Sequence, residues 1–118
     1  MKKIKIINIS NGKVIAERGL LANNFLSRFK GLIGRDDLGY DEGLCILPCK
    51  SVHTCFMKFS IDVIFVDRND KACKIIQDLK PWKISGFVKN AKYVIEIPAN
   101  KSEMLRIEVG DKVEIRTN

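Results

Sequence analysis

The chain has 118 residues, of which 46% are hydrophobic and 30% charged, and its formal net charge is +7. This length and apolar content suit one globular domain over residues 1–118 with a single core. The apolar windows are too short, and too often interrupted by charge, for a transmembrane segment or a signal peptide. We therefore expect a cytoplasmic protein whose cysteines are free thiols.

The first third of the chain predicts a hairpin followed by a helix. Residues 3–9 alternate apolar and polar side chains, and turn formers follow them. This pattern predicts a β-hairpin in which Asn11 and Gly12 both have positive φ, as in a type I′ turn. Apolar residues then recur at helical spacing, which predicts a helix over residues 24–33 with one buried stripe that includes Phe25 and Phe29. Asn23 or Asn24 would cap this helix, and Gly34 would end it.

The rest of the chain predicts short strands in close succession. The expected strands cover residues 44–47, 52–57, 61–66, 72–79, 91–97 and 112–116. Residues 68–71 form a hairpin turn, and residues 101–105 form one helical turn. Trp82 and Phe87 are expected in the core, and the alternative is that they stack on a base or another flat ligand. Strands at this spacing favour an antiparallel barrel over a parallel sheet. The predicted fold is therefore mostly β: a small antiparallel β-barrel-like domain with one short packed α-helix.

The chemically versatile residues are concentrated between Gly43 and Asp67, a stretch that holds the only histidine and three of the four cysteines. If residues 52–57 form a strand, His53, Cys55 and Met57 lie on the same face. The ligand types and spacing of Cys45, Cys49, His53 and Cys55 allow a zinc site, and the same thiols can instead be small buried apolar groups. A further alternative is a catalytic thiol, Cys49 or Cys55, activated by His53.

Two acids lie within apolar strands. Asp62 shares its face with apolar residues, so its carboxylate must be hydrogen-bonded, paired with a cation or neutral. It either accepts backbone N–H groups and caps a loop, or it anchors a pocket together with His53. Glu96 lies in a similar setting and either faces solvent or joins the same pocket. Arg28 and Arg35, near the ends of the predicted helix, are candidate contacts for an anion.

Several of these segments together carry a recognisable pattern. They are RFKGLIGR at residues 28–35, Gly43, PCKSVHTCFMKFSIDVIFVD at residues 48–67, AKYVIEIPA at residues 91–99, and the Gly-Asp pair at residues 110–111. In this order the segments resemble the DUF192 family of uncharacterised small proteins. The resemblance implies a compact β-barrel-like fold with a short helix and supplies no reaction.

The leading hypothesis is a non-enzymatic binding module for a small ligand or peptide. Its pocket would be lined by His53, Met57, Asp62, Arg35 and Glu96, because polar groups gather there on apolar strands without a complete catalytic arrangement. No cofactor is predicted. One alternative is a metal- or thiol-dependent enzyme that uses Cys49, His53 and Cys55, with zinc as the metal. The other is a nucleic-acid-binding protein that uses its basic surface.

Overall fold

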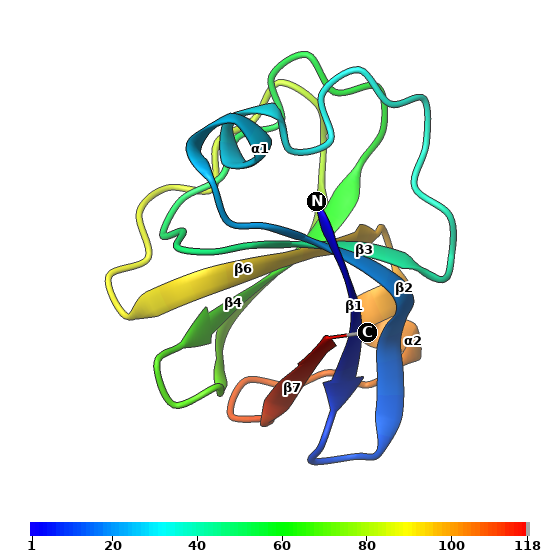
Figure 1. Ribbon diagram of the computed structural model, residues 1–118, viewed down its shortest axis with the longest axis vertical. Coiled ribbons are helices and arrows are strands. Elements are labelled where there is room, and N and C mark those ends of the chain that lie inside the picture. The colour runs from blue at the N-terminus through cyan, green and yellow to red at the C-terminus, as the bar shows by residue number, and fades with distance from the viewer. Residues whose placement is uncertain (118) are drawn as a thin grey trace.

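A computed structural model describes residues 1–117 and confirms a mostly β fold (Figure 1). A seven-stranded sheet has the order β5-β4-β6-β3-β2-β1-β7. The strands are β1 (Lys2–Asn8), β2 (Lys13–Ala22), β3 (Glu42–Ile46), β4 (Ile61–Asp67), β5 (Ala72–Leu79), β6 (Ala91–Pro98) and β7 (Val113–Thr117). Two short helices, α1 (Phe25–Lys30) and α2 (Lys101–Met104), complete the described elements.

The sheet curls into a half-barrel, and its two edges approach each other where the start of β5 bonds to the turn that precedes β7. The N–H of Ala72 donates to the carbonyl of Asp111 at 2.8 Å, and the N–H of Gly110 donates to the carbonyl of Ala72 at 2.7 Å. Most strand pairs are antiparallel, as predicted, but β2 and β3 are parallel. A parallel pair needs a crossover connection. The segment that contains α1 is that crossover, and Figure 1 shows α1 above one face of the sheet.

Apolar side chains on the two faces of the sheet form two clusters. Along β4, Ile64 and Val66 belong to the cluster inside the half-barrel, whereas Val63 and Phe65 belong to the cluster on the other face. This alternation is the two-residue period of a strand, and it explains why β4 is apolar at almost every position. The second cluster is covered by the segments that surround α1, through residues such as Leu32.

The helix is shorter than predicted and does not bury its apolar stripe. Asn24 caps it as expected, because its side chain accepts the N–H of Ser27 at 2.9 Å. The helix ends at Gly31, whose φ is 48°. Phe25 and Phe29 are 73% and 70% exposed, so their expected burial is wrong. Six residues make fewer than two turns, and the buried side chain of this segment is instead Leu32, just past the helix.

Residues 52–57 do not form the predicted strand. His53 makes only an isolated bridge with Ile84, and the chain then turns, with the N–H of Met57 donating to the carbonyl of Thr54 at 3.1 Å. Phe56 has a φ of 67° within this turn. A turn removes the alternation of faces that a strand would impose. Consequently His53 is exposed while Met57 is buried, and the two do not lie on one strand face.

Two smaller expectations are also wrong. The β1–β2 hairpin is present, but only Gly12 of the Asn11-Gly12 pair has positive φ. The Asn11 side chain instead accepts the N–H of Lys13 at 3.0 Å, which stabilises the turn without a left-handed residue at that position. Trp82 and Phe87 are exposed rather than packed in the core.

Candidate functional site

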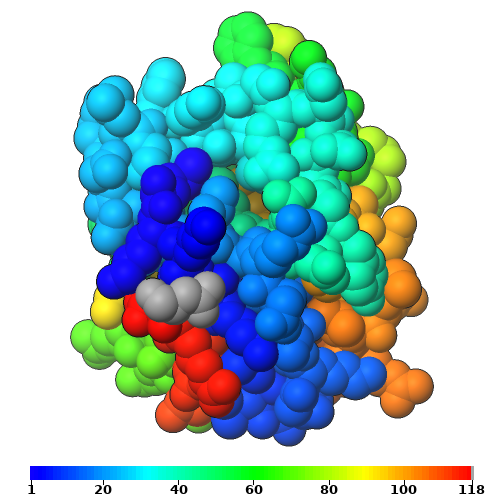
Figure 2. All heavy atoms as spheres, turned by 45° about the vertical axis from the view of Figure 1, so that its right-hand side comes forward, coloured from blue at the N-terminus to red at the C-terminus, as the bar shows by residue number. Residues whose placement is uncertain are grey.

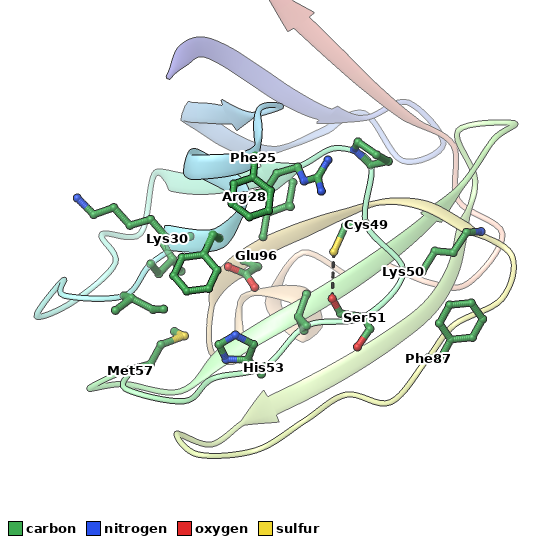
Figure 3. A pocket seen from close by; sticks show the side chains of 17 residues that line it. Phe25, Arg28, Lys30, Cys49, Lys50, Ser51, His53, Met57, Phe87 and Glu96 are labelled. Carbon is green, nitrogen blue, oxygen red and sulfur yellow. Dashed lines mark hydrogen bonds between the residues drawn. The ribbon is translucent and has the colours of Figure 1, made fainter.

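A pocket of about 430 Å³ lies beside α1 and is here called the α1 pocket (Figure 3). One wall is α1 itself, and the other walls come from residues 46–53 and from β6. Its apolar lining includes Phe25, Phe29, Leu32, Ile46, Val52 and Met57. Arg28, Lys30 and Lys50 supply cationic groups, and in Figure 3 the side chains of Lys30 and Lys50 extend outward. The pocket thus combines apolar walls with positive charge at its rim.

Glu96 is the acid of this pocket. It is 3% exposed, and its neighbours on the adjacent strands are Leu44 and Val63. Figure 3 shows its carboxyl group between Phe25 and Arg28 on one side and His53 and Met57 on the other. Among residues 1–117 no side chain or backbone group hydrogen-bonds to this carboxyl group, and its oxygens retain contact with the pocket. Burial raises the pKa of Glu96 to about 8. At neutral pH it is therefore a neutral acid that can donate its proton in a hydrogen bond.

Cys49 and Lys50 form the wall that follows β3. The N–H of Cys49 donates to the carbonyl of Lys92 at 2.9 Å, which fixes this segment beside β6. The Cys49 thiol donates to the carbonyl of Ser51 at 3.1 Å, and burial raises its pKa. The ammonium group of Lys50 donates to the carbonyls of Lys89 and Ala91 at 2.7 and 2.8 Å. The wall is therefore held by hydrogen bonds rather than by packing alone.

Three of the five predicted pocket residues come together here: His53, Met57 and Glu96. His53 lies at the exposed rim, and its Nδ1 accepts the N–H of Cys55 at 3.2 Å. The other ring nitrogen, Nε2, therefore carries the hydrogen of the neutral imidazole. Met57 contributes a buried thioether to the wall.

Asp62 and Arg35 do not line the α1 pocket. Asp62 is fully buried and accepts the N–H groups of Asp78, Asn100 and Ser102 at 2.9, 3.1 and 2.9 Å. The Ser102 hydroxyl adds a fourth bond at 2.6 Å. The interpretation of Asp62 as an acceptor of backbone N–H groups is thus the one that agrees with the structure, and its expected partnership with His53 is wrong. Arg35 instead makes two bonds of 3.0 Å to the carboxylate of Glu42.

The four residues that made a zinc site an alternative, Cys45, Cys49, His53 and Cys55, do not converge. Cys45 belongs to the cluster inside the half-barrel, and burial raises the pKa of its thiol to about 12. Cys49 lines the α1 pocket, whereas Cys55 does not. Within residues 1–117, no group of three or more His, Cys, Asp or Glu side chains is placed to hold a metal ion.

Sequence reasoning missed Phe25, Phe29 and Lys50 as lining residues. The two phenylalanines have the spacing of a buried helical stripe, and periodicity alone does not distinguish a core face from a pocket wall. A signal was nevertheless present in Gly31. A glycine so soon after Phe29 can end the helix before it is long enough to bury a full apolar stripe.

The fold and the site together define a small half-barrel protein with an open, partly apolar pocket. The chain belongs to the DUF192 family, since the model of that family, described as "Uncharacterized ACR", matches residues 6–115. A UPF0127 protein of Pyrococcus furiosus is 36% identical over 92% of this chain and 96% of its own length. A UPF0127 protein of Pyrococcus abyssi is 40% identical over 92% of this chain and 95% of its own.

Solved structures share the fold. A protein of unknown function from Novosphingobium aromaticivorans is 26% identical, has a TM-score of 0.78, and matches 95% of this chain and 83% of its own. A structure from Sinorhizobium meliloti is 20% identical with a TM-score of 0.79, matches 97% of this chain and 92% of its own, and bears on the fold alone. Among the described residues, no helix has the length and apolar content needed to cross a bilayer.

Proposed function

We propose that the protein is a binding module that takes a small ligand, or the end of a peptide, into the α1 pocket. The observation that carries this proposal is Glu96, a buried carboxyl group without a hydrogen-bond partner among residues 1–117 that lines an open pocket. Its oxygens stay accessible from the pocket, so a ligand that displaces water there can accept a hydrogen bond from this carboxyl group.

The pocket favours a ligand with an apolar body and a carboxylate or carbonyl head. Glu96 holds its proton at neutral pH and donates it to an acceptor. Arg28, Lys30 and Lys50 attract an anion to the rim, and the same charges repel a cation. The phenylalanine and aliphatic walls then cover the apolar body.

Binding is supported better than thiol chemistry. A nucleophilic cysteine needs a lowered pKa, whereas burial raises the pKa of the Cys49 thiol. The Nδ1 of His53 accepts a backbone N–H, and the Cys49 thiol donates to a backbone carbonyl rather than to the imidazole. Neither residue has the base and nucleophile geometry of an activated thiol.

The test uses two probes with the same body and opposite heads, 4-phenylbutyrate and 4-phenylbutylamine. Their affinities are measured by ¹⁵N-labelled NMR titration, which also maps the site. We expect 4-phenylbutyrate to bind and to shift the amide signals of Cys49 and Glu96, with an affinity that falls about tenfold per pH unit above about 8. Tighter binding of the amine, or shifts confined to other regions, would overturn the proposal.

Variants at Glu96 sharpen this test. Glu96→Gln keeps a donor, so binding of 4-phenylbutyrate should persist and lose its pH dependence. Glu96→Leu removes the donor and should weaken binding by about tenfold or more. Glu103→Gln, at an exposed position of α2, is the matched control and should leave binding unchanged. A peptide that ends in Phe with a free carboxylate, compared with its amide, distinguishes a peptide end from a free small molecule.

A further inference from the structure

Three large apolar side chains project from two neighbouring loops beyond the α1 pocket. Phe56, Trp82 and Ile84 are 66%, 61% and 72% exposed, and we call them the aromatic tip. The rings of Phe56 and Trp82 pack against each other with centroids 4.7 Å apart. In Figure 1 the green and yellow loops that contain these residues lie at the same end of the molecule as α1, and Figure 2 shows their atoms at its top.

The two loops are held together by backbone hydrogen bonds. The N–H of Thr54 donates to the carbonyl of Lys83 at 2.9 Å, and the N–H of Trp82 donates to the carbonyl of Thr54 at 3.0 Å. The Thr54 hydroxyl is itself buried and donates to the carbonyl of Lys80 at 2.5 Å. The exposure of the aromatic tip is therefore a property of a fixed arrangement rather than of a loose loop.

The backbone at the aromatic tip is unfavourable for the residues that occupy it. Phe56 and Trp82 have φ values of 67° and 65°, in the left-handed region that bulky residues seldom adopt. Glycine or asparagine would fit these turns with less strain. Burial in the core does not offset this backbone strain, because both aromatic rings remain exposed. Residues with strained backbone conformations cluster at active sites, ligand contacts and switch regions.

Basic residues are concentrated in the segments that form this end of the molecule, although Lys89 lies farther away, beside Asp67 and Arg68 at the opposite end of β4. Residues 25–30, 47–58 and 80–90 contain no Asp or Glu, and their basic residues are Arg28, Lys30, Lys50, Lys58, Lys80, Lys83 and Lys89. The remaining Lys and Arg are equal in number to the 14 acidic residues, so these three segments account for the net charge of +7. Asp36 and Asp78 pair with Lys58 and Lys80. Among residues 1–117, no carboxylate lies within 4.0 Å of Lys30, Lys83 or Lys89.

We propose that the aromatic tip and the surrounding lysines dock the protein on the surface of an anionic lipid bilayer. Lysines are attracted to anionic headgroups, each contributing about fivefold in binding, and a tryptophan ring suits the interface between headgroup and hydrocarbon. Ile84 and the exposed Leu26 of α1 gain from contact with hydrocarbon. Aliphatic side chains gain nothing from stacking on bases, and the tilted contact of 59° between the two rings leaves no parallel platform, so a single-stranded nucleic acid fits less well. The aromatic tip does not line the α1 pocket, so its docking does not depend on the ligand proposed for that pocket.

Trp82 is the only tryptophan of the chain, so its fluorescence reports on this surface directly. We expect its emission to shift to the blue when vesicles of phosphatidylcholine with about 30% phosphatidylserine are added at about 0.1 M salt. Brominated lipids should quench it. Vesicles of phosphatidylcholine alone should cause a much smaller shift. An unchanged emission with anionic vesicles would overturn the proposal, as would a stronger response to oligo(dT) or to a polyglutamate peptide.

Two sets of variants separate charge from apolar contact. The double charge reversal Lys58→Glu with Lys83→Glu, at the two lysines close to Phe56 and Trp82 in the sequence, should weaken vesicle binding at least 25-fold, taking about fivefold per removed lysine. Lys13→Glu with Lys71→Glu makes the same change in net charge at the start of β2 and at the β-bridge to Lys112, outside the three basic segments, and should have a much smaller effect. Phe56→Ser with Ile84→Ser keeps Trp82 as the reporter and should abolish its blue shift. Equal loss of binding in both charge-reversal variants, or an unchanged shift in the serine variant, would contradict a specific docking surface. Circular dichroism confirms that each variant is folded.

Discussion

Glu96 and Cys49 face the same pocket, and the charge of an ionised Glu96 adds to burial in raising the pKa of the Cys49 thiol. Arg28 acts in the opposite direction. The thiol is consequently protonated at neutral pH and makes a hydrogen bond to Ser51. Cys49 is therefore a reporter on the pocket, and burial is the main cause of its raised pKa, with an ionised Glu96 as a smaller one.

The stability of the protein should depend on the protonation of Glu96. Its pKa is about 8 in the folded chain and 4.5 ordinarily, so between these values the folded state retains a proton that the unfolded state loses. The free energy of unfolding therefore falls as the pH rises from 4.5 through 8. Glu96→Gln removes this penalty and should raise the free energy of unfolding by on the order of 5 kcal/mol at about pH 9, with little effect at about pH 4.

Urea unfolding at these two pH values measures the effect. Glu103→Gln is the control, because the Glu103 side chain is exposed. A Glu96→Gln variant that is less stable than the parent at the higher pH would show that Glu96 is ionised and stabilised in the fold.

A ligand in the α1 pocket should protect Cys49 from alkylation. Cys49 is partly buried and lines the pocket, whereas Cys55 and Cys73 lie outside it and serve as internal controls. Saturating 4-phenylbutyrate should slow carbamidomethylation of Cys49 by about tenfold and leave the two controls unchanged. Mass spectrometry of the digested protein gives the rate at each site. Equal protection of all three cysteines would point to a global effect and not to the pocket.

Asp62 should contribute to the stability of the fold and not to ligand binding in the α1 pocket. Its carboxylate accepts the N–H groups of Asp78, Asn100 and Ser102, and Asp62→Ala would leave buried donors unpaired. We expect a loss of about 2–4 kcal/mol in the free energy of unfolding, measured by urea denaturation. Asp67→Ala, which removes similar bonds from an exposed turn, should lose less than about 1 kcal/mol. A small effect at Asp62 would contradict its assignment as the anchor between β4, β5 and α2.

Substitution of Phe56 in the aromatic tip should change the free energy of unfolding only slightly. Phe56→Gly relieves the positive φ but loses the ring contact with Trp82, and these effects should cancel to within about 1 kcal/mol. Phe65→Ala empties a fully buried site and should lose about 3–5 kcal/mol. Thermal unfolding of the two variants tests the contrast. A large loss for Phe56→Gly would assign Phe56 a structural role.

Much of the fold follows from local patterns. Alternation and turn residues predict the hairpins and the late strand that contains Glu96, and family resemblance supports the same architecture. The parallel pairing of β2 with β3 was not predicted, because strand direction depends on where the crossover through α1 leads. Residues 52–57 have the composition of a strand, but the Thr54 hydroxyl and the backbone of the 80–83 loop turn them into a loop.

The site was harder to predict than the fold. Asp62 and Glu96 look alike in the sequence, since each is an acid among apolar strand residues. What separates them is tertiary: the start of α2 brings N–H donors to Asp62, and no hydrogen-bonding group among the described residues reaches Glu96. The basic residues beside the aromatic tip were overlooked because Lys58 and Lys83 come from segments far apart in the sequence, and only the fold brings these segments together.

The central claim is that Glu96 is a neutral acid at the α1 pocket, ready to donate to a ligand. Titration of the Glu96 carboxyl carbon by ¹³C NMR, in the free protein and with 4-phenylbutyrate, tests it most directly. We predict a pKa of about 8 for the free protein and a higher pKa with the ligand, because an anion that accepts the proton stabilises the neutral acid. A pKa near the ordinary value of 4.5, or one that falls on addition of 4-phenylbutyrate, would contradict this claim.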